Sequence, residues 1–186
     1  LRAHGALITS LASTDFTGFD PAFAMPTIDK TATSPEPTFK DAVFPTKIQT
    51  VQAFVDPNGQ RQQLVLIAGQ FASDPTATNG TGRQRNFTQI GTQVYYAPTS
   101  QIDFKAAEFG LVQGATIGGN WVTFSVHAND GVGAGVKRVL VGYHDGTTWK
   151  FVDLQPSGGD LWTGGGSTTT PNPEFFVQAV DGAGNV

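Results

Sequence analysis

Apolar and polar residues alternate along several stretches of the chain, most clearly from residue 121 to residue 129. Side chains on a β-strand point alternately to its two faces. We therefore expect a strand here, with Val122, Phe124 and Val126 facing a core and Trp121 and His127 facing solvent.

Further short strands are expected around this one, at the close spacing typical of a β-sandwich. They span residues 110–117, 136–144, 148–154, 161–163 and 174–181. The glycine run at 164–166 lacks the lysine and hydroxyl residues of a phosphate-binding loop, and we interpret it as a flexible connection.

Upstream, two apolar stretches flank the turn Asp56-Pro57-Asn58-Gly59 and predict a β-hairpin. The first stretch, residues 48–55, alternates, whereas the second, residues 61–71, is apolar on both faces. Such a run favours a central strand that is covered on both sides. Residues 86–96 predict another strand.

The beginning of the chain is irregular and rich in proline and phenylalanine. Proline blocks both helix and central-strand pairing, so we expect an extended segment with one strand at residues 4–11. Its aromatic side chains would pack on its own domain or on another chain. The predicted organisation is an extended segment (1–45), an irregular β-rich N-terminal domain (46–105) and a C-terminal β-sandwich (106–186).

Composition supports an all-β fold, because Gly 23, Pro 11 and only 14% charged residues favour short strands joined by turns. The net charge of -4, without any Lys/Arg cluster, argues against nucleic-acid binding. No apolar run reaches the roughly 18 residues that membrane insertion needs. The absence of cysteine excludes a disulfide scaffold. Together with the low proportion of charged residues, it gives a composition similar to that of exported proteins of bacteria or archaea.

Four features follow one another in residues 108–186: a glycine-rich turn (129–136), the strand that follows it (139–143), a Gly-Thr-Thr-Trp hairpin (146–149) and the terminal segment (175–185). In this order they resemble a bacterial immunoglobulin-like or fibronectin type III-like module. The resemblance implies an immunoglobulin-like sandwich, an extracellular or cell-surface location and a structural role.

The resemblance is incomplete at the end of the chain. Where the family pattern reads Tyr-x-Val-x-Ala, this chain has Phe175, Val177 and Ala179, so the ring can be buried but the tyrosine hydroxyl bond is lost. Such modules normally add one more strand after this segment. Either the domain has been trimmed, or a neighbouring copy lends an extended segment such as residues 1–23 and a filament forms by strand donation.

Several aspartates lie in or beside turns, and calcium prefers such oxygens gathered at one end of a sandwich. Asp130 and Asp181 are the candidates, because modules of this kind can bring their two turns together. Neither belongs to an EF-hand motif. The alternative is that each carboxylate only caps its own turn.

An exposed tryptophan on a sandwich face can stack on a sugar ring, and Trp121 is the candidate because alternation places it outward. Tryptophan is more often a core residue or an edge cover, which is the interpretation we favour for Trp121 as well as for Trp149 and Trp162. Asn79 and Asn86 fit the acceptor rule for N-glycosylation, although such tripeptides also arise by chance.

No catalytic signature is present: His4, His127 and His144 are the only histidines, and Gly-x-Ser-x-Gly is absent. We therefore expect a non-enzymatic extracellular structural or cell-surface module without an obligatory cofactor. Its partners would be copies of itself or neighbouring surface-protein domains. The alternative is a carbohydrate-binding or accessory module of a larger secreted hydrolase.

Overall fold

The computed structural model describes residues 1–21, 43–74, 76–77 and 80–186. Within these residues the chain forms strands and no helix, which confirms the all-β prediction. The strands are β1 (Arg2–Phe19), β2 (Gln49–Asp56), β3 (Gly59–Leu66), β4 (Gly69–Ser73), β5 (Gly82–Ala97), β6 (Glu108–Ile117), β7 (Trp121–Asn129), β8 (Val136–His144), β9 (Trp149–Asp153), β10 (Gln155–Pro156), β11 (Leu161–Ser167) and β12 (Phe175–Asp181).

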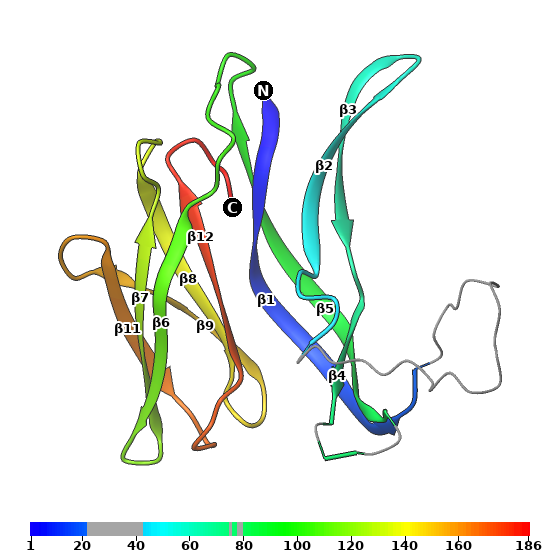
Figure 1. The fold of residues 1–186 in the computed structure, drawn as a ribbon, viewed down its shortest axis with the longest axis vertical. Coiled ribbons are helices and arrows are strands. Elements are labelled where there is room, and N and C mark those ends of the chain that lie inside the picture. Colours follow the sequence, from blue (N-terminus) through cyan, green and yellow to red (C-terminus); the bar gives the residue numbers. More distant parts are fainter. Residues whose placement is uncertain (22–42, 75, 78–79) are drawn as a thin grey trace, which may run out of the picture. The chain divides into compact units, whose positions relative to one another are not determined.

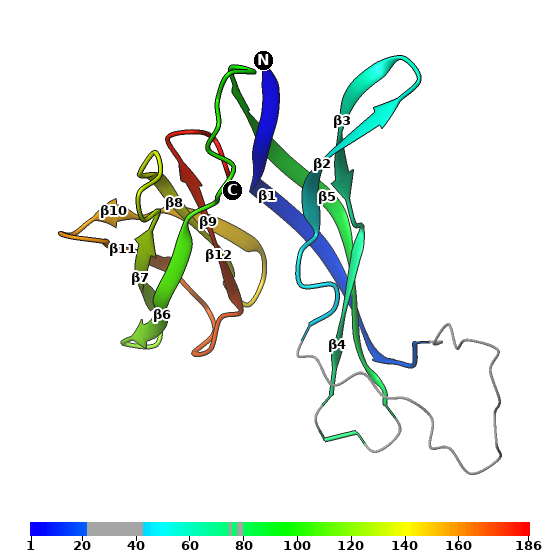
Figure 2. The same cartoon turned by 45° about the horizontal axis from the view of Figure 1, so that its top comes forward.

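The second half of the chain is a sandwich of two antiparallel sheets (Figures 1 and 2). One sheet has the strand order β10-β11-β7-β6 and the other the order β12-β8-β9. The core between them is formed by side chains of β7, β8 and β12 together with Leu154.

β7 has the predicted alternation. Val122, Phe124 and Val126 are at most 2% exposed and belong to the core, whereas Trp121 is 47% exposed and His127 lies on the outer face. The strict period of two in this sequence therefore identified both the strand and its buried face.

The interpretation of the glycine run as a flexible connection is wrong, because all three glycines lie inside β11. A Cβ atom at Gly164 would lie 2.8 Å from Leu154, one at Gly165 would lie 2.8 Å from the Trp121 indole, and one at Gly166 would lie 2.1 Å from the Tyr143 hydroxyl. β11 therefore carries glycine because large side chains press on its backbone from both faces.

Phe175 cannot form the tyrosine hydroxyl bond of the family pattern, but a tyrosine on another strand, Tyr143 of β8, bonds the backbone in a similar way. The Phe175 ring packs against Phe124, with ring centroids 5.2 Å apart. On β8, the hydroxyl of Tyr143 donates to the backbone oxygen of Ser167 at 3.1 Å and ties β8 to the end of β11.

The expectation of a central strand at residues 61–71 is wrong. This apolar stretch is divided between β3, whose partner among the described strands is β2, and β4, which pairs with β5. Leu66 and Ile67 lie near the division and are 44% and 38% exposed. An apolar run alone cannot show that the chain changes partner strands within it.

β1 is longer and more regular than expected: it is an 18-residue strand, in a sheet of order β1-β5-β4. Contacts divide the chain into two compact units, one comprising residues 1–12, 49–65 and 89–186 and the other residues 13–48 and 66–88. β1 and β5 thus contribute to both units. The proline-rich part of the first 45 residues lies largely outside the described residues.

The first half of β1 lies against the outer face of the β12-β8-β9 sheet. Leu140 and Val180, which are not part of the sandwich core, are only 2% and 0% exposed there. The Gln178 side chain of β12 accepts a hydrogen bond from Ile8 N at 2.8 Å and donates one to Ile8 O at 3.0 Å. One side-chain amide therefore satisfies both backbone groups of a buried residue of β1.

Candidate metal centre

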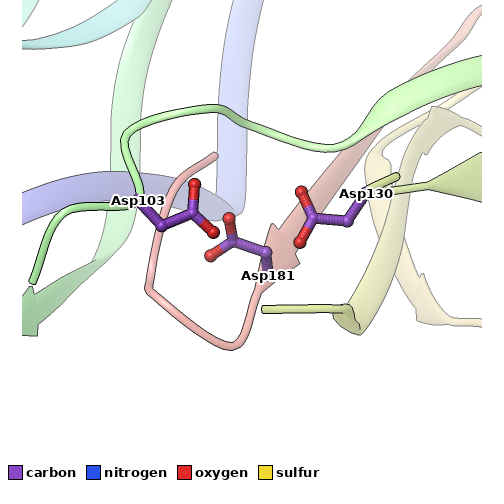
Figure 3. Close-up of side chains that lie close together, drawn as sticks. All are labelled: Asp103, Asp130 and Asp181. Carbon is purple, nitrogen blue, oxygen red and sulfur yellow. The ribbon is translucent and has the colours of Figure 1, made fainter. Parts of the chain in front are cut away.

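Three aspartates from separate parts of the sequence converge at one end of the sandwich. Asp103 lies in the coil between β5 and β6, Asp130 follows β7 and Asp181 ends β12. Each offers a carboxylate oxygen, and these oxygens all lie within 4.8 Å of one another. Figure 3 shows the Asp103 and Asp130 carboxylates pointing toward Asp181 from opposite sides.

Asp181 is held by the turn that follows it. Its Oδ1 accepts hydrogen bonds from the N–H groups of Ala183 and Asn185, both at 2.8 Å, and its Oδ2 accepts one from Asn185 Nδ2 at 2.7 Å. Gly184 has a φ of 88°, a conformation that L side chains rarely adopt. The Asp-Gly-Ala-Gly-Asn sequence therefore builds a turn that fixes a carboxylate which is only 1% exposed.

The β7–β8 turn provides a hydrogen-bond donor for only one of the two carboxylate oxygens of Asp130. Its Oδ2 accepts a hydrogen bond from Gly135 N at 2.7 Å, and Gly133 approaches so closely that a Cβ there would lie 2.4 Å from this oxygen. Its Oδ1 is buried and has no hydrogen-bond partner. A buried carboxylate oxygen without a partner is costly unless a donor or a cation reaches it.

Asp103 joins the connecting coil to both turns. Its Oδ1 accepts from Lys105 N and its Oδ2 from Ala134 N in the β7–β8 turn, both at 3.1 Å. The side chain of Asn185 donates to the backbone oxygens of Asp103 at 3.3 Å and of Lys105 at 3.4 Å. The coil and the terminal turn thus share one network of bonds.

Within the described residues no basic side chain forms an ion pair with these three carboxylates. Lys105 is the nearest in sequence, and its Nζ pairs with Glu108 at 2.7 Å; this hydrogen bond, with a smaller contribution from the charge of Asp130, raises the pKa of the Lys105 ammonium. Three like charges this close repel one another strongly, and a divalent cation between them would reverse the sign of the interaction.

The geometry suits calcium. Calcium binds oxygen at 2.3–2.6 Å, so two ligands on opposite sides of the ion lie up to about 5 Å apart. The three carboxylate oxygens all lie within 4.8 Å of one another, close enough to share one calcium ion. Asp130 and Asp181, the two predicted candidates, do meet at this site, and they also cap turns as the alternative interpretation expected.

Sequence reasoning missed Asp103. It lies in Gln101-Ile102-Asp103-Phe104-Lys105, which contains no ligand motif and no turn signature. Its distance from Asp130 and Asp181 along the chain hides the relationship, and only the folded path of the coil reveals it.

The predicted glycan-binding and glycosylation residues are not part of the carboxylate cluster. Trp121 is exposed, with its indole against Gly165, whereas Trp162 packs on the core and Trp149 packs on Phe176. Asn86 is exposed on β5, and Asn79 lies outside the described residues.

The histidines have separate environments. Nδ1 of His127 lies 2.8 Å from Asp160, and this hydrogen bond lowers the pKa of the Asp160 carboxyl. In the part of the chain that the structure describes, no serine or threonine hydroxyl is bonded to His127. His144 contacts the edge of Trp149, and His4 stacks on Phe104.

Comparison with known proteins gives no relative: no protein-family model matches the chain, and no curated protein or solved structure is significantly similar to it. Among the described residues, no helix is long and apolar enough to cross a membrane.

Proposed function

We propose that this protein is a non-catalytic structural module of an extracellular or cell-surface protein, and that a calcium ion at Asp103, Asp130 and Asp181 stabilises it. The observation that carries the proposal is the meeting of three carboxylates, one of which keeps a buried oxygen without a partner. The family resemblance of residues 108–186 supports the extracellular setting.

An ion at this site would link three segments: the coil before β6, the β7–β8 turn and the end of β12. The last two already meet through the pairing of Asp181 with Val136, so the ion would mainly add the coil to them. Extracellular modules bind calcium with dissociation constants of about 10⁻⁴–10⁻³ M, which suits a site of few protein ligands in a calcium-rich medium. The ion would act as a cross-link and would take part in no reaction.

We propose that the module spaces or packs neighbouring domains in a surface assembly. Assembly into a filament by donation of residues 1–23 would require β1 to leave β5, its partner in the same chain. Electron microscopy and the mass of native assemblies distinguish the two arrangements: filaments support strand donation, and discrete particles support a spacer.

The calcium site is tested by thermal unfolding in about 10 mM calcium or in chelator. For the dissociation constants above, the ion should add about 1.4–2.7 kcal/mol and raise Tm by several degrees. Asp130→Asn should lose most of this gain. Asp160→Asn, which changes an exposed carboxylate outside the cluster, should keep it.

A parent protein whose Tm is the same in calcium and in chelator would contradict the site. Magnesium at the same concentration should give a smaller gain, because magnesium demands near-ideal octahedral geometry and gives up its bound waters reluctantly.

Trp121 supports a second candidate function, glycan binding as a carbohydrate-binding or accessory module. Its indole is 47% exposed and lies along the glycine backbone of β11, which leaves a ring face open to a sugar. A glycan array should show binding that Trp121→Ala abolishes and Val132→Ala, at another exposed position, preserves. An array without signal above background rules this function out.

A further inference from the structure

The coil that carries Asp103 is the least secured part of the proposed calcium site. Residues 98–107 contain no strand and connect β5 to β6. Two of their apolar side chains are largely exposed, Ile102 at 88% and Phe104, which stacks on His4, at 59%. The side chain of Asp103 therefore bonds the sandwich from a segment that buries little apolar surface.

Few hydrogen bonds hold this coil to the sandwich. Those around Asp103 are long, namely the bond from Ala134 N to Asp103 at 3.1 Å and the two bonds from Asn185 Nδ2 at 3.3 and 3.4 Å. The ammonium of Lys105 adds a bond of 2.7 Å to the exposed carboxylate of Glu108 at the start of β6. Toward β1, the guanidinium of Arg2 lies over the Phe104 ring at 4.2 Å and bonds the backbone of Gln101. Segments with few buried contacts open locally at a small fraction of the free energy of global unfolding.

The other two ligands are held by shorter bonds. Asp181 accepts three hydrogen bonds of 2.7–2.8 Å from its own turn. Asp130 accepts one of 2.7 Å from Gly135 N, in a turn that is also closed by the bond from Gly133 N to the Asp130 backbone oxygen at 2.9 Å. When the three carboxylates repel one another without a cation, Asp103 is thus the group that can move away at least cost. Its departure would also let solvent reach the unpartnered Oδ1 of Asp130.

We infer that calcium acts as a latch on this coil: bound ion holds residues 101–105 against the sandwich, and loss of the ion releases them to proteases. The inference rests on the proposed calcium site. It adds a consequence, namely that the calcium concentration decides whether the connection between β5 and β6 can be cut.

Lys105 provides a direct reporter of the latch. It lies two residues beyond Asp103, and its side chain is 70% exposed, so only the backbone conformation limits cleavage of the Lys105–Ala106 bond. When opening is fast, cleavage follows the population of the open form, which bound ligand reduces by the factor 1 + [L]/Kd. About 10 mM calcium should therefore slow cleavage about 10- to 100-fold for dissociation constants of 10⁻³–10⁻⁴ M.

The experiment digests the full chain with a lysine-specific protease that does not itself require calcium, in calcium or in chelator, and identifies the fragments by mass. Cleavage after Lys47, an exposed residue outside any strand and outside the carboxylate cluster, serves as the internal control. Asp103→Asn should be cut after Lys105 at the same fast rate in both media. Asp160→Asn should behave as the parent does.

The outcomes separate the latch from the site. If calcium raises Tm but leaves cleavage after Lys105 unchanged, the latch is wrong and the calcium site stands. If calcium changes neither Tm nor cleavage, both are overturned. If Asp103→Asn is still protected by calcium, Asp103 is not the latch and the inference fails.

Discussion

Gln178 bridges β12 and β1 through its side-chain amide, and replacing it by leucine removes that bridge while keeping a side chain of similar size. Ile8, whose N–H and C=O both bond the amide, is only 4% exposed. In Gln178→Leu, both backbone groups lose their partner while they remain buried.

The expected loss follows from this geometry. Each buried backbone group left without a partner costs about 1–3 kcal/mol, so two groups cost about 2–6 kcal/mol. The apolar leucine would return about 1 kcal/mol, because the position is only partly buried. We therefore expect the free energy of unfolding to fall by about 1–5 kcal/mol.

Urea unfolding followed by tryptophan fluorescence measures this change, because Trp121, Trp149 and Trp162 all lie in strands of the sandwich. Gln113→Leu makes the same replacement at an exposed position of β6 and should change stability by less than about 0.5 kcal/mol. If Gln178→Leu is no less stable than Gln113→Leu, the bridge contributes nothing and the reasoning is refuted.

Two further changes test the packing of the sandwich. Burial alone would raise the pKa of Asp145, but hydrogen bonds from Lys150 and from two backbone N–H groups lower it to about 2. The stability that this carboxylate contributes should therefore be complete above about pH 4 and be lost as the pH falls through 2. Asp145→Asn should show a flatter dependence of the free energy of unfolding on pH over that range. Gly166→Ala would bring a methyl group against the Tyr143 hydroxyl and should cost about 1–3 kcal/mol, part of which the double variant with Tyr143→Phe should recover; strictly additive effects in that cycle would contradict the contact.

Features set by neighbouring residues were readable from the sequence. The alternation in β7 and the apolar run of β8 predicted both strands with the boundaries that the structure shows. Each signal lies within the strand itself, because the period of two reports directly which side chains face a core.

Features set by distant residues were not readable. The glycines of β11 have the composition of a loop, and they form a strand because Leu154, Trp121 and Tyr143 occupy the space that side chains would need. Asp103 joins the candidate metal centre only through the path of the coil that carries it. In both cases the deciding neighbours are remote in sequence, and no local pattern records them.

The contact between Ile8 and Gln178 also has a consequence for biosynthesis, because the two residues are 170 positions apart. A ribosome adds about 5–20 residues per second, so Ile8 exists for on the order of 10–30 s before Gln178 has been made. β1 can pair with β5 before then, but the backbone groups of Ile8 that bond Gln178 lack this partner and are open to mispairing with other chains. A trigger-type chaperone that shields nascent strands should therefore raise the yield of folded protein, and N-terminal tags that delay the pairing of β1 should lower it.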